Sequence, residues 1–381
     1  MYSLRQFGHM ISDPVRIRAY DRAIAAAVKP GDVVVDLGAG TGVFSLMACK
    51  YGARHVYAID YNPAINVGME HAQANGFADR ITFIRANSTT VELPERADVV
   101  LGDIRGRLPP LQIGIEVYRD ARDRFLKPGG VVIPQRDTIF AAPVEDADLY
   151  RREVVEPWQE NLLGLDLSVS LPSITSSQVG YRIEETDLLL AAQPWVELDY
   201  AGGEFKPAPG PMVFRSERTR RLHFLALWFD TELFQGIGFS NAPGGEMPRV
   251  YGQLLLPFAQ PIEIGAGDRL EVELRSDRMR DDYIFTWRSR LYHNGDEAPA
   301  LTLRQSNFDA LPIESVTKRS ESFVPEISFV GRATGRAIAL LADGLSVGDA
   351  AGTILREFPE LGFDDNRALA FTADLSQQYS S

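Results

Sequence analysis

The sequence predicts an α/β chain that begins with a doubly wound parallel sheet and continues into an antiparallel β-rich part and a small helical part. Up to Pro134, short β-branched runs alternate with helical patterns, as in a parallel sheet. From there to about Ile313, prolines and glycines separate strand-like runs at short intervals, which is typical of a β-sandwich or a β-barrel. Helical periodicity then returns up to the C-terminus.

The N-terminal part begins with a helix over residues 12–28, where apolar residues recur at helical spacing. Asp13 followed by Pro14 is a typical helix start. Buried parallel strands and intervening helices then alternate. The expected strands are 32–36, 56–60, 81–84, 97–101 and 130–133, and the expected helices lie near 44–51, 64–75 and 111–126.

These patterns divide the chain into three expected domains: residues 1–134, 135–312 and 313–381. A helical stretch inside the second domain, at about 149–180, is expected to project from the strands as an arm. Expected strands of the second domain include 222–229, 269–274 and 283–287, and expected C-terminal helices are 335–342, 346–358 and 364–379.

Composition excludes several classes of protein. A net charge of -13 argues against non-specific binding to nucleic acid, because phosphate contacts need a clustered basic surface. The sequence has no apolar run of membrane-spanning length and no hydrophobic signal core near Met1, so we expect a cytoplasmic protein without membrane contact. One cysteine, and five histidines without ligand spacing, predict neither a disulfide nor a structural metal.

A glycine-rich loop between the first strand and the next helix is the main functional signal. Gly38, Gly40 and Gly42 alternate with small residues, and they allow a sharp bend and close approach of a ligand. A dinucleotide fingerprint needs one more glycine, where this chain has Val43, and this disfavours a nicotinamide cofactor. The loop therefore predicts a phosphate-free nucleoside ligand, S-adenosylmethionine (SAM).

Polar residues at the ends of neighbouring strands fit the same ligand. Asp36 begins the glycine loop, where an acid suits the ammonium group of SAM, and Asp60 ends the second strand, where a carboxylate can accept the ribose hydroxyls. Asn87 and Ser88 follow the third strand, where either could bond adenine. Both are also common turn residues, so an ordinary turn is the alternative at this point.

Residues 7–312 resemble the protein arginine methyltransferase family. The resemblance is carried by residues 33–42, which match its cofactor motif, and by 10–20, 118–129 and 132–134. It implies a Rossmann-like class I SAM methyltransferase domain, a β-barrel, and a dimerisation arm inserted in that barrel, hence a homodimer. By position, Arg16 would hold the SAM carboxylate and Met10 would line the methyl-donor site. His9, beside Met10, is a possible base.

The chain departs from the family in the loop that binds the acceptor. Family members carry two glutamates that grip the substrate guanidinium, which stays protonated because its pKa lies above ~12. Asp103 and Gln112 stand at these positions, so ordinary arginine methylation is not expected. We expect Asp103 to orient the acceptor or act as its base, Gln112 to contact an uncharged or differently charged group, and Arg105 or Arg107 to bind a substrate carboxylate.

The C-terminal helices resemble the small peptide-binding domain of pyrroloquinoline quinone biosynthesis, on residues 339–344, 346–351 and 354–359. The resemblance implies a peptide delivered in trans, by strand addition at a sheet edge near residues 322–330. A helical appendage that stabilises the barrel is the alternative.

Together these observations predict a SAM-dependent methyltransferase that modifies a side chain of a peptide or protein with non-standard acceptor chemistry. The acceptor atom and the number of methyl groups are left open. One alternative is a small-molecule N- or O-methyltransferase. Another is a catalytically silent SAM-binding regulator, which the altered glutamate positions favour.

Overall fold

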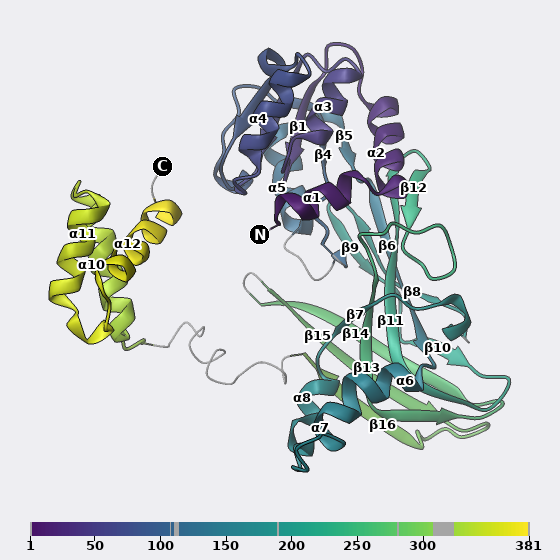
Figure 1. Cartoon of the computed structure of the whole chain (residues 1–381). Helices are drawn as coiled ribbons and strands as arrows, with labels where there is room; N and C mark the ends of the chain where they lie inside the picture. The colour runs from purple at the N-terminus through teal and green to yellow at the C-terminus, as the bar shows by residue number, and fades with distance from the viewer. Residues whose placement is uncertain are drawn as a thin grey trace. The chain divides into compact units, whose positions relative to one another are not determined.

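The computed structural model describes residues 2–106, 108–109, 114–188, 190–279, 282–307 and 324–379. Contacts divide the chain into two compact units, Met1–Ala310 and Leu311–Ser381 (Figure 1). The first unit contains both a parallel sheet and antiparallel sheets, and the second is helical where it is described.

A five-stranded parallel sheet in the order β3-β2-β1-β4-β5 forms the N-terminal part of the first unit. Because β1 lies between β2 and β4, the strand order reverses there, and ligands of doubly wound sheets bind at such a point, beyond the carboxyl ends of the strands. The strands are β1 (Val33–Leu37), β2 (His55–Ile59), β3 (Ile81–Ile84), β4 (Ala97–Gly102) and β5 (Leu126–Ile133).

Helices α1 to α5 surround this sheet (Figure 1). The Asp13 carboxylate accepts hydrogen bonds from the backbone N–H groups of Val15 and Arg16, so the expected first helix begins at Pro14 as α2. One further short helix, α1, precedes it. The bounds are α1 (Leu4–Ile11), α2 (Pro14–Ala27), α3 (Val43–Lys50), α4 (Ile65–Ala74) and α5 (Gly114–Phe125), with short 3-10 turns η1 (Ala78–Arg80) and η2 (Ser88–Thr90).

The rest of the first unit consists of two antiparallel sheets, in the orders β10-β14-β15-β16 and β7-β13-β11-β6-β8-β9, with β12 paired to β11. The strands are β6 (Arg136–Val144), β7 (Val179–Tyr181), β8 (Gln193–Asp199), β9 (Glu204–Pro207), β10 (Met212–Arg215), β11 (Arg220–Phe234), β12 (Ile237–Ser240), β13 (Gln253–Ile264), β14 (Arg269–Met279), β15 (Asp282–Tyr292) and β16 (Leu301–Ser306).

The parallel and antiparallel parts share one hydrophobic core. β6 begins three residues after β5 ends, and β11, the longest strand, pairs with it. β11 and β12 also contact α2, and Figure 1 shows β6 and β11 running away from the parallel sheet. Apolar residues of both parts, from Val35 in β1 to Phe229 in β11, belong to a single buried cluster. This continuity fixes β6 and β11 next to the carboxyl end of β4.

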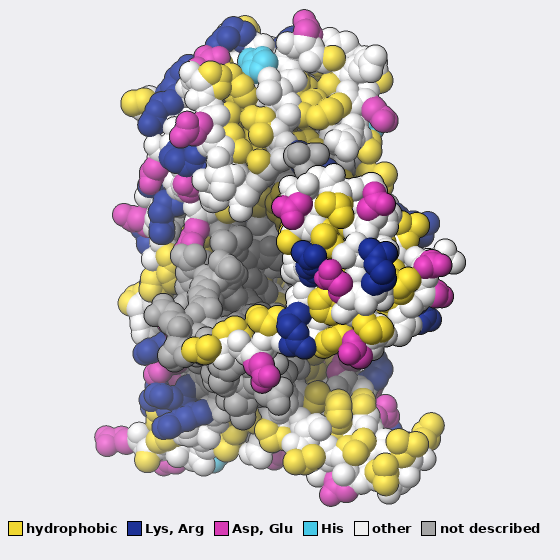
Figure 2. All heavy atoms as spheres, turned by 90° about the vertical axis from the view of Figure 1, so that its left-hand side faces the viewer, with side chains coloured by type: hydrophobic (Ala, Val, Ile, Leu, Met, Phe, Trp, Pro, Cys, Tyr) yellow, Lys and Arg dark blue, Asp and Glu magenta, His cyan; other side chains and the backbone are white. Residues whose placement is uncertain are grey.

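The expected arm consists of short helical segments between β6 and β7. A separate buried cluster, which includes Tyr150 and Val154, packs it against the antiparallel sheet. The segments are α6 (Ala147–Tyr150), the π-helical turn η4 (Arg151–Val155), α7 (Glu156–Gln159), η5 (Ser168–Ser170) and α8 (Leu171–Thr175), and the further turn η6 (Glu185–Asp187) follows β7. Leu162, Leu163 and Val169 are exposed, and Figure 2 shows hydrophobic side chains gathered at the bottom of the face that it presents.

The second unit contains α10 (Phe329–Ala342), α11 (Val347–Glu357), the turn η7 (Pro359–Leu361) and α12 (Asp365–Tyr379), around a small core of its own. The expected sheet edge near 322–330 is wrong at its C-terminal end, because Ser328 caps α10 and the chain is helical from Phe329. Residues 322–323 lie outside the described residues. Among the described residues, no helix combines the length and the apolar composition needed to cross a bilayer.

Candidate functional site

The predicted glycine loop lies between β1 and α3 and has a backbone that favours glycine. Gly38, Gly40 and Gly42 have φ angles of 66°, 52° and 75°, in the left-handed region. The ring of Phe7, on α1, lies where a side chain at Gly40 would be. Helix α1 therefore covers the loop, and a larger residue at position 40 would have to displace it.

Asp36, at the start of this loop, is a buried carboxyl group with one unpaired oxygen. Its Oδ2 accepts a hydrogen bond of 2.6 Å from the Ser45 hydroxyl, whereas its Oδ1 has no partner among the described residues. Burial raises the pKa of Asp36 to about 7. A buried acid with an unpaired oxygen fits a cationic ligand group, because a further positive charge nearby would stabilise its ionised form.

Asp60 lies beside the same loop, as the sequence predicts. One carboxylate oxygen accepts the Gly40 N–H at 2.7 Å and the other accepts the Asn62 N–H at 2.7 Å. These bonds hold the loop against the end of β2. A carboxylate has about four lone-pair sites, so each oxygen can still accept a ligand hydroxyl.

Arg16 comes to the same edge of the sheet from α2. Its Nε donates to Asp103 at 2.6 Å and its Nη1 donates to the carbonyl oxygen of Met10 at 3.2 Å. The guanidinium lies over the rings of Tyr20 and Phe44, at 5.3 Å and 5.1 Å. Its Nη2 has no hydrogen-bond partner in the part of the chain that the structure describes, so this nitrogen is available for an anionic ligand group.

The remaining predicted ligand residues lie nearer the surface. Met10 is half-buried at the end of α1, and the neighbouring His9 is exposed. Asn87 is exposed and its side chain accepts the Thr89 N–H at 3.1 Å, so it caps the turn that contains Ser88. Asn87 thus has the turn-forming role that the sequence left as the alternative.

Asp103 is enclosed by donors from three segments. Its Oδ2 accepts from the Arg16 Nε and from the Tyr251 hydroxyl at 2.5 Å, and its Oδ1 accepts from the Nε and Nη2 of Arg105 at 3.1 Å and 3.0 Å. Burial favours the neutral acid, but the positive charges of Arg16 and Arg105 prevail and hold the pKa of Asp103 well below its usual range. Both oxygens of Asp103 thus accept hydrogen bonds within the chain, and its roles in orienting the acceptor or acting as its base stay predictions.

Arg105 lies at the centre of the same cluster. It is fully buried, and each of its five N–H groups has an acceptor. Besides the two bonds to Asp103, its Nη1 donates to Asp137 at 2.9 Å and to the Thr231 hydroxyl at 2.5 Å, and its Nη2 donates to the Tyr20 hydroxyl at 3.0 Å. It therefore has no donor left for a substrate carboxylate, the role that the sequence offered to Arg105 or Arg107.

Two predicted acceptor residues, Arg107 and Gln112, lie outside the described residues. The sequence interpretation missed Asp137, Tyr20 and Tyr251, which complete the cluster around Asp103 and Arg105. One sequence signal could have found Asp137: it is a charged residue near the start of the apolar run that forms β6. The structure buries it completely.

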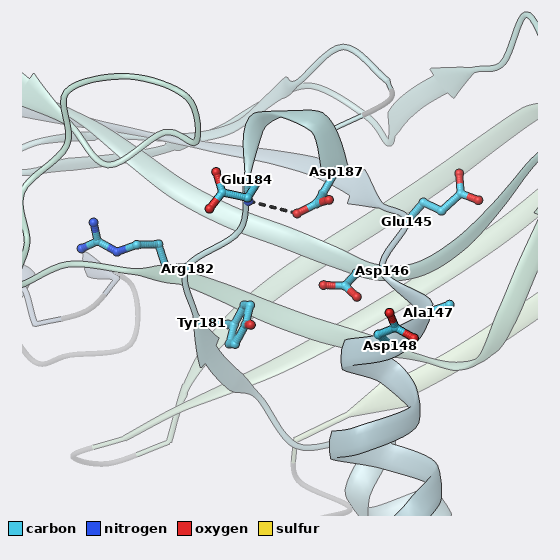
Figure 3. Close-up of a pocket in the computed structure, with 8 residues that line it drawn as sticks. All are labelled: Glu145, Asp146, Ala147, Asp148, Tyr181, Arg182, Glu184 and Asp187. Carbon is cyan, nitrogen blue, oxygen red and sulfur yellow. Dashed lines mark hydrogen bonds between the residues drawn. The ribbon is translucent and has the colours of Figure 1, made fainter.

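A cavity of about 470 Å³ lies elsewhere, on the antiparallel part (Figure 3). It is lined by Glu145, Asp146, Ala147, Asp148, Tyr181, Arg182, Glu184 and Asp187. The Glu184 backbone N–H donates to Asp187 at 2.9 Å, as the dashed line shows. None of the predicted site residues lines this cavity. A second cavity of about 270 Å³ lies beside α4 and β3.

Comparison with known proteins identifies relatives of this arrangement. Residues 17–133 match the family model of ribosomal protein L11 methyltransferase (PrmA). A probable histone-arginine methyltransferase 1.4 of Arabidopsis thaliana is 33% identical over 281 residues, covering 69% of this chain and 52% of that protein. Protein arginine N-methyltransferase 1 of Saccharomyces cerevisiae is 26% identical over 275 residues, covering 70% of this chain and 78% of that protein.

The curated relatives and the structural neighbours of this chain are protein arginine methyltransferases. Its fold agrees: the Trypanosoma brucei PRMT1 enzyme-prozyme complex with AdoHcy has a TM-score of 0.70 at 20% identity, covering 80% of this chain and 98% of that chain. Arabidopsis thaliana protein arginine methyltransferase 10 has a TM-score of 0.67 at 20% identity, covering 80% of this chain and 97% of that chain. The chain spans about half the length of the curated relatives matched at 32–34% identity.

Proposed function

We propose that the chain is a SAM-dependent methyltransferase that acts on a side chain of a peptide or protein. The observation that carries this proposal is the pairing of the glycine loop with the unpaired oxygen of Asp36. The comparisons add support, because several relatives are named as arginine methyltransferases.

The residues of the loop suit the polar groups of SAM. Asp36 would compensate the ammonium group, Nη2 of Arg16 would bind the carboxylate, and Asp60 would accept the ribose hydroxyls. Bound SAM supplies a methyl group on a positively charged sulfur, which a nucleophile held in line can attack. The protein's contribution is to hold the acceptor and to exclude water.

The acceptor chemistry that we propose differs from arginine methylation. Asp103 stands where a glutamate would grip the substrate guanidinium, but its two oxygens are already bonded to Arg16, Tyr251 and Arg105. An acceptor that needs a free carboxylate would find none at Asp103.

Calorimetric titration with S-adenosylhomocysteine tests the cofactor assignment. We expect clear binding heat, lost in Asp60→Ala, and no heat with a nicotinamide nucleotide. The matched control is Asp79→Ala, because Asp79 is an acid on the turn before β3, away from the glycine loop. Binding of the nicotinamide nucleotide in preference to S-adenosylhomocysteine would contradict the proposal.

The closed surroundings of Asp103 favour a second candidate, a regulator that binds SAM without transferring its methyl group. Incubation with radiolabelled SAM and a peptide library separates the two candidates. Label in any peptide supports the enzyme. Cofactor binding without label in peptides or small amines supports the regulator.

We further propose that the arm mediates homodimerisation and that the second unit binds the peptide substrate. Leu162 is fully exposed and Leu163 is largely exposed. Adjacent exposed leucines lose the free energy of burial unless a partner covers them. Replacing both with serine should shift the mass measured by sedimentation towards the monomer. An unchanged mass would exclude the arm as the contact.

A further inference from the structure

The surroundings of Arg105 form a complete binding site for a guanidinium group, filled from within the chain. Asp103 and Asp137 accept its hydrogen bonds from two sides. The rings of Phe229 and Phe239 each lie 5.3 Å from its Cζ, the geometry of a cation–π contact. Two carboxylates and two aromatic faces are what an enclosed guanidinium requires.

The charges of this cluster already balance. Arg16 and Arg105 contribute two positive charges, and Asp103 and Asp137 contribute two negative charges, all on side chains that are almost fully buried. The second oxygen of Asp137 accepts from the Tyr200 hydroxyl at 2.7 Å. A cationic acceptor beside Asp103 would add a third positive charge with no further carboxylate from the cluster to compensate it.

We infer that Arg105 determines which acceptor is used: its internal guanidinium takes the carboxylate that a substrate guanidinium would need, so the acceptor is an uncharged side-chain nitrogen or oxygen. This inference rests on the proposed function. The acceptor's lone pair forms the new bond to the methyl carbon, the electrons of the broken S–C bond remain on a neutral thioether, and the acceptor's proton leaves to water. No step uses Asp103 as a base.

Binding of N-acetyl-arginine amide, measured by calorimetry on the full chain, tests the role of Arg105. We expect no binding to the unaltered protein at millimolar probe. Arg105→Met leaves a net negative charge on the cluster, and we expect it to bind the probe at least about tenfold more tightly, because like-charge repulsion is removed. Arg105→Lys is the matched control: it keeps the positive charge and should show no gain.

A second variant covers the case in which Arg105→Met does not fold. Arg105→Met combined with Asp137→Asn removes the charge that Asp137 would otherwise keep without a partner, and it still frees Oδ1 of Asp103. This double variant should also bind the probe more tightly than Arg105→Lys. Equal probe binding by the unaltered protein and a folded methionine variant would overturn the inference. So would a double variant that folds and binds no better than Arg105→Lys.

The outcomes separate this inference from the proposed function. The probe titration needs no cofactor, and the S-adenosylhomocysteine titration needs no acceptor. If S-adenosylhomocysteine does not bind but the arginine probe behaves as expected, only the methyltransferase assignment is contradicted. In the label assay, an unaltered protein that methylates arginine peptides would overturn the role of Arg105 while supporting the methyltransferase.

Discussion

The glycine loop and the loop after β4 lie at the same edge of the parallel sheet but differ in how their polar groups are satisfied. Within the described residues, Asp36 at the glycine loop keeps an oxygen without a partner, and Nη2 of Arg16 makes no hydrogen bond. At the loop after β4, the donors of Arg105 and both oxygens of Asp103 are bonded within the chain. A site that awaits a charged ligand leaves groups uncompensated, whereas a structural cluster does not.

The largest expected effect is on the stability of the protein, through the closed cluster of Arg16, Asp103, Arg105 and Asp137. Asp137→Ala leaves Arg105 buried with one carboxylate, and we expect the free energy of unfolding, measured with urea, to fall by about 3 kcal/mol. Asp120→Ala is the control, because Asp120 forms a half-exposed pair with Arg124 and should cost about 0.5 kcal/mol. Similar losses in the two variants would mean that the cluster is not a closed unit.

Substitution in the glycine loop should weaken cofactor binding most. Gly40→Leu places a side chain against Phe7 and strains a left-handed backbone, and we expect the affinity for S-adenosylhomocysteine to fall about 100-fold, or about 2.7 kcal/mol. Gly76→Leu has a comparable φ of 73° but open space around it, so it should leave binding unchanged. Intact binding by Gly40→Leu would place the cofactor elsewhere.

The raised pKa of Asp36 predicts how binding and stability depend on pH. The ammonium group of S-adenosylhomocysteine needs the ionised carboxylate of Asp36 as its partner. The affinity for this ligand should therefore fall by up to about tenfold per pH unit as the pH drops below about 7. Because the folded protein holds this proton more tightly than the unfolded chain, the contribution of Asp36 to stability is fully present below pH about 4 and is lost as the pH rises through about 7. Asp36→Asn should abolish both trends; if it leaves them intact, another group titrates.

The smallest expected effect concerns a single hydrogen bond of the closed cluster. Tyr251→Phe removes one donor from Asp103, which keeps Arg16 and Arg105, so the unfolding free energy should fall by about 1 kcal/mol. Binding of S-adenosylhomocysteine should stay within about twofold of its original value, because the hydroxyl of Tyr251 bonds to Asp103 and not to the glycine loop. A large loss of cofactor affinity would mean that the two loops do not act separately.

The sequence predicted the parts of the molecule that depend on local pattern. The strands of the parallel sheet, the cap at Asp13 and the glycine loop follow from neighbouring residues. The structure has them where they were expected, except that β5 begins at Leu126, four residues before its expected start. The altered glutamate position was also visible in the sequence, although its consequence was not. Arg105 was assigned to the substrate because its partners Tyr20, Asp137 and Thr231 lie 85, 32 and 126 residues away, and only the fold brings them together.

The core shared by the parallel and antiparallel parts has a consequence for how the chain comes apart. A fragment that ends at Pro134 would lose Asp137 and Thr231, and it would expose to solvent the apolar surface that β6 and β11 cover. Heating should therefore melt these two parts in a single calorimetric transition, while the C-terminal helices, with their own core, melt independently.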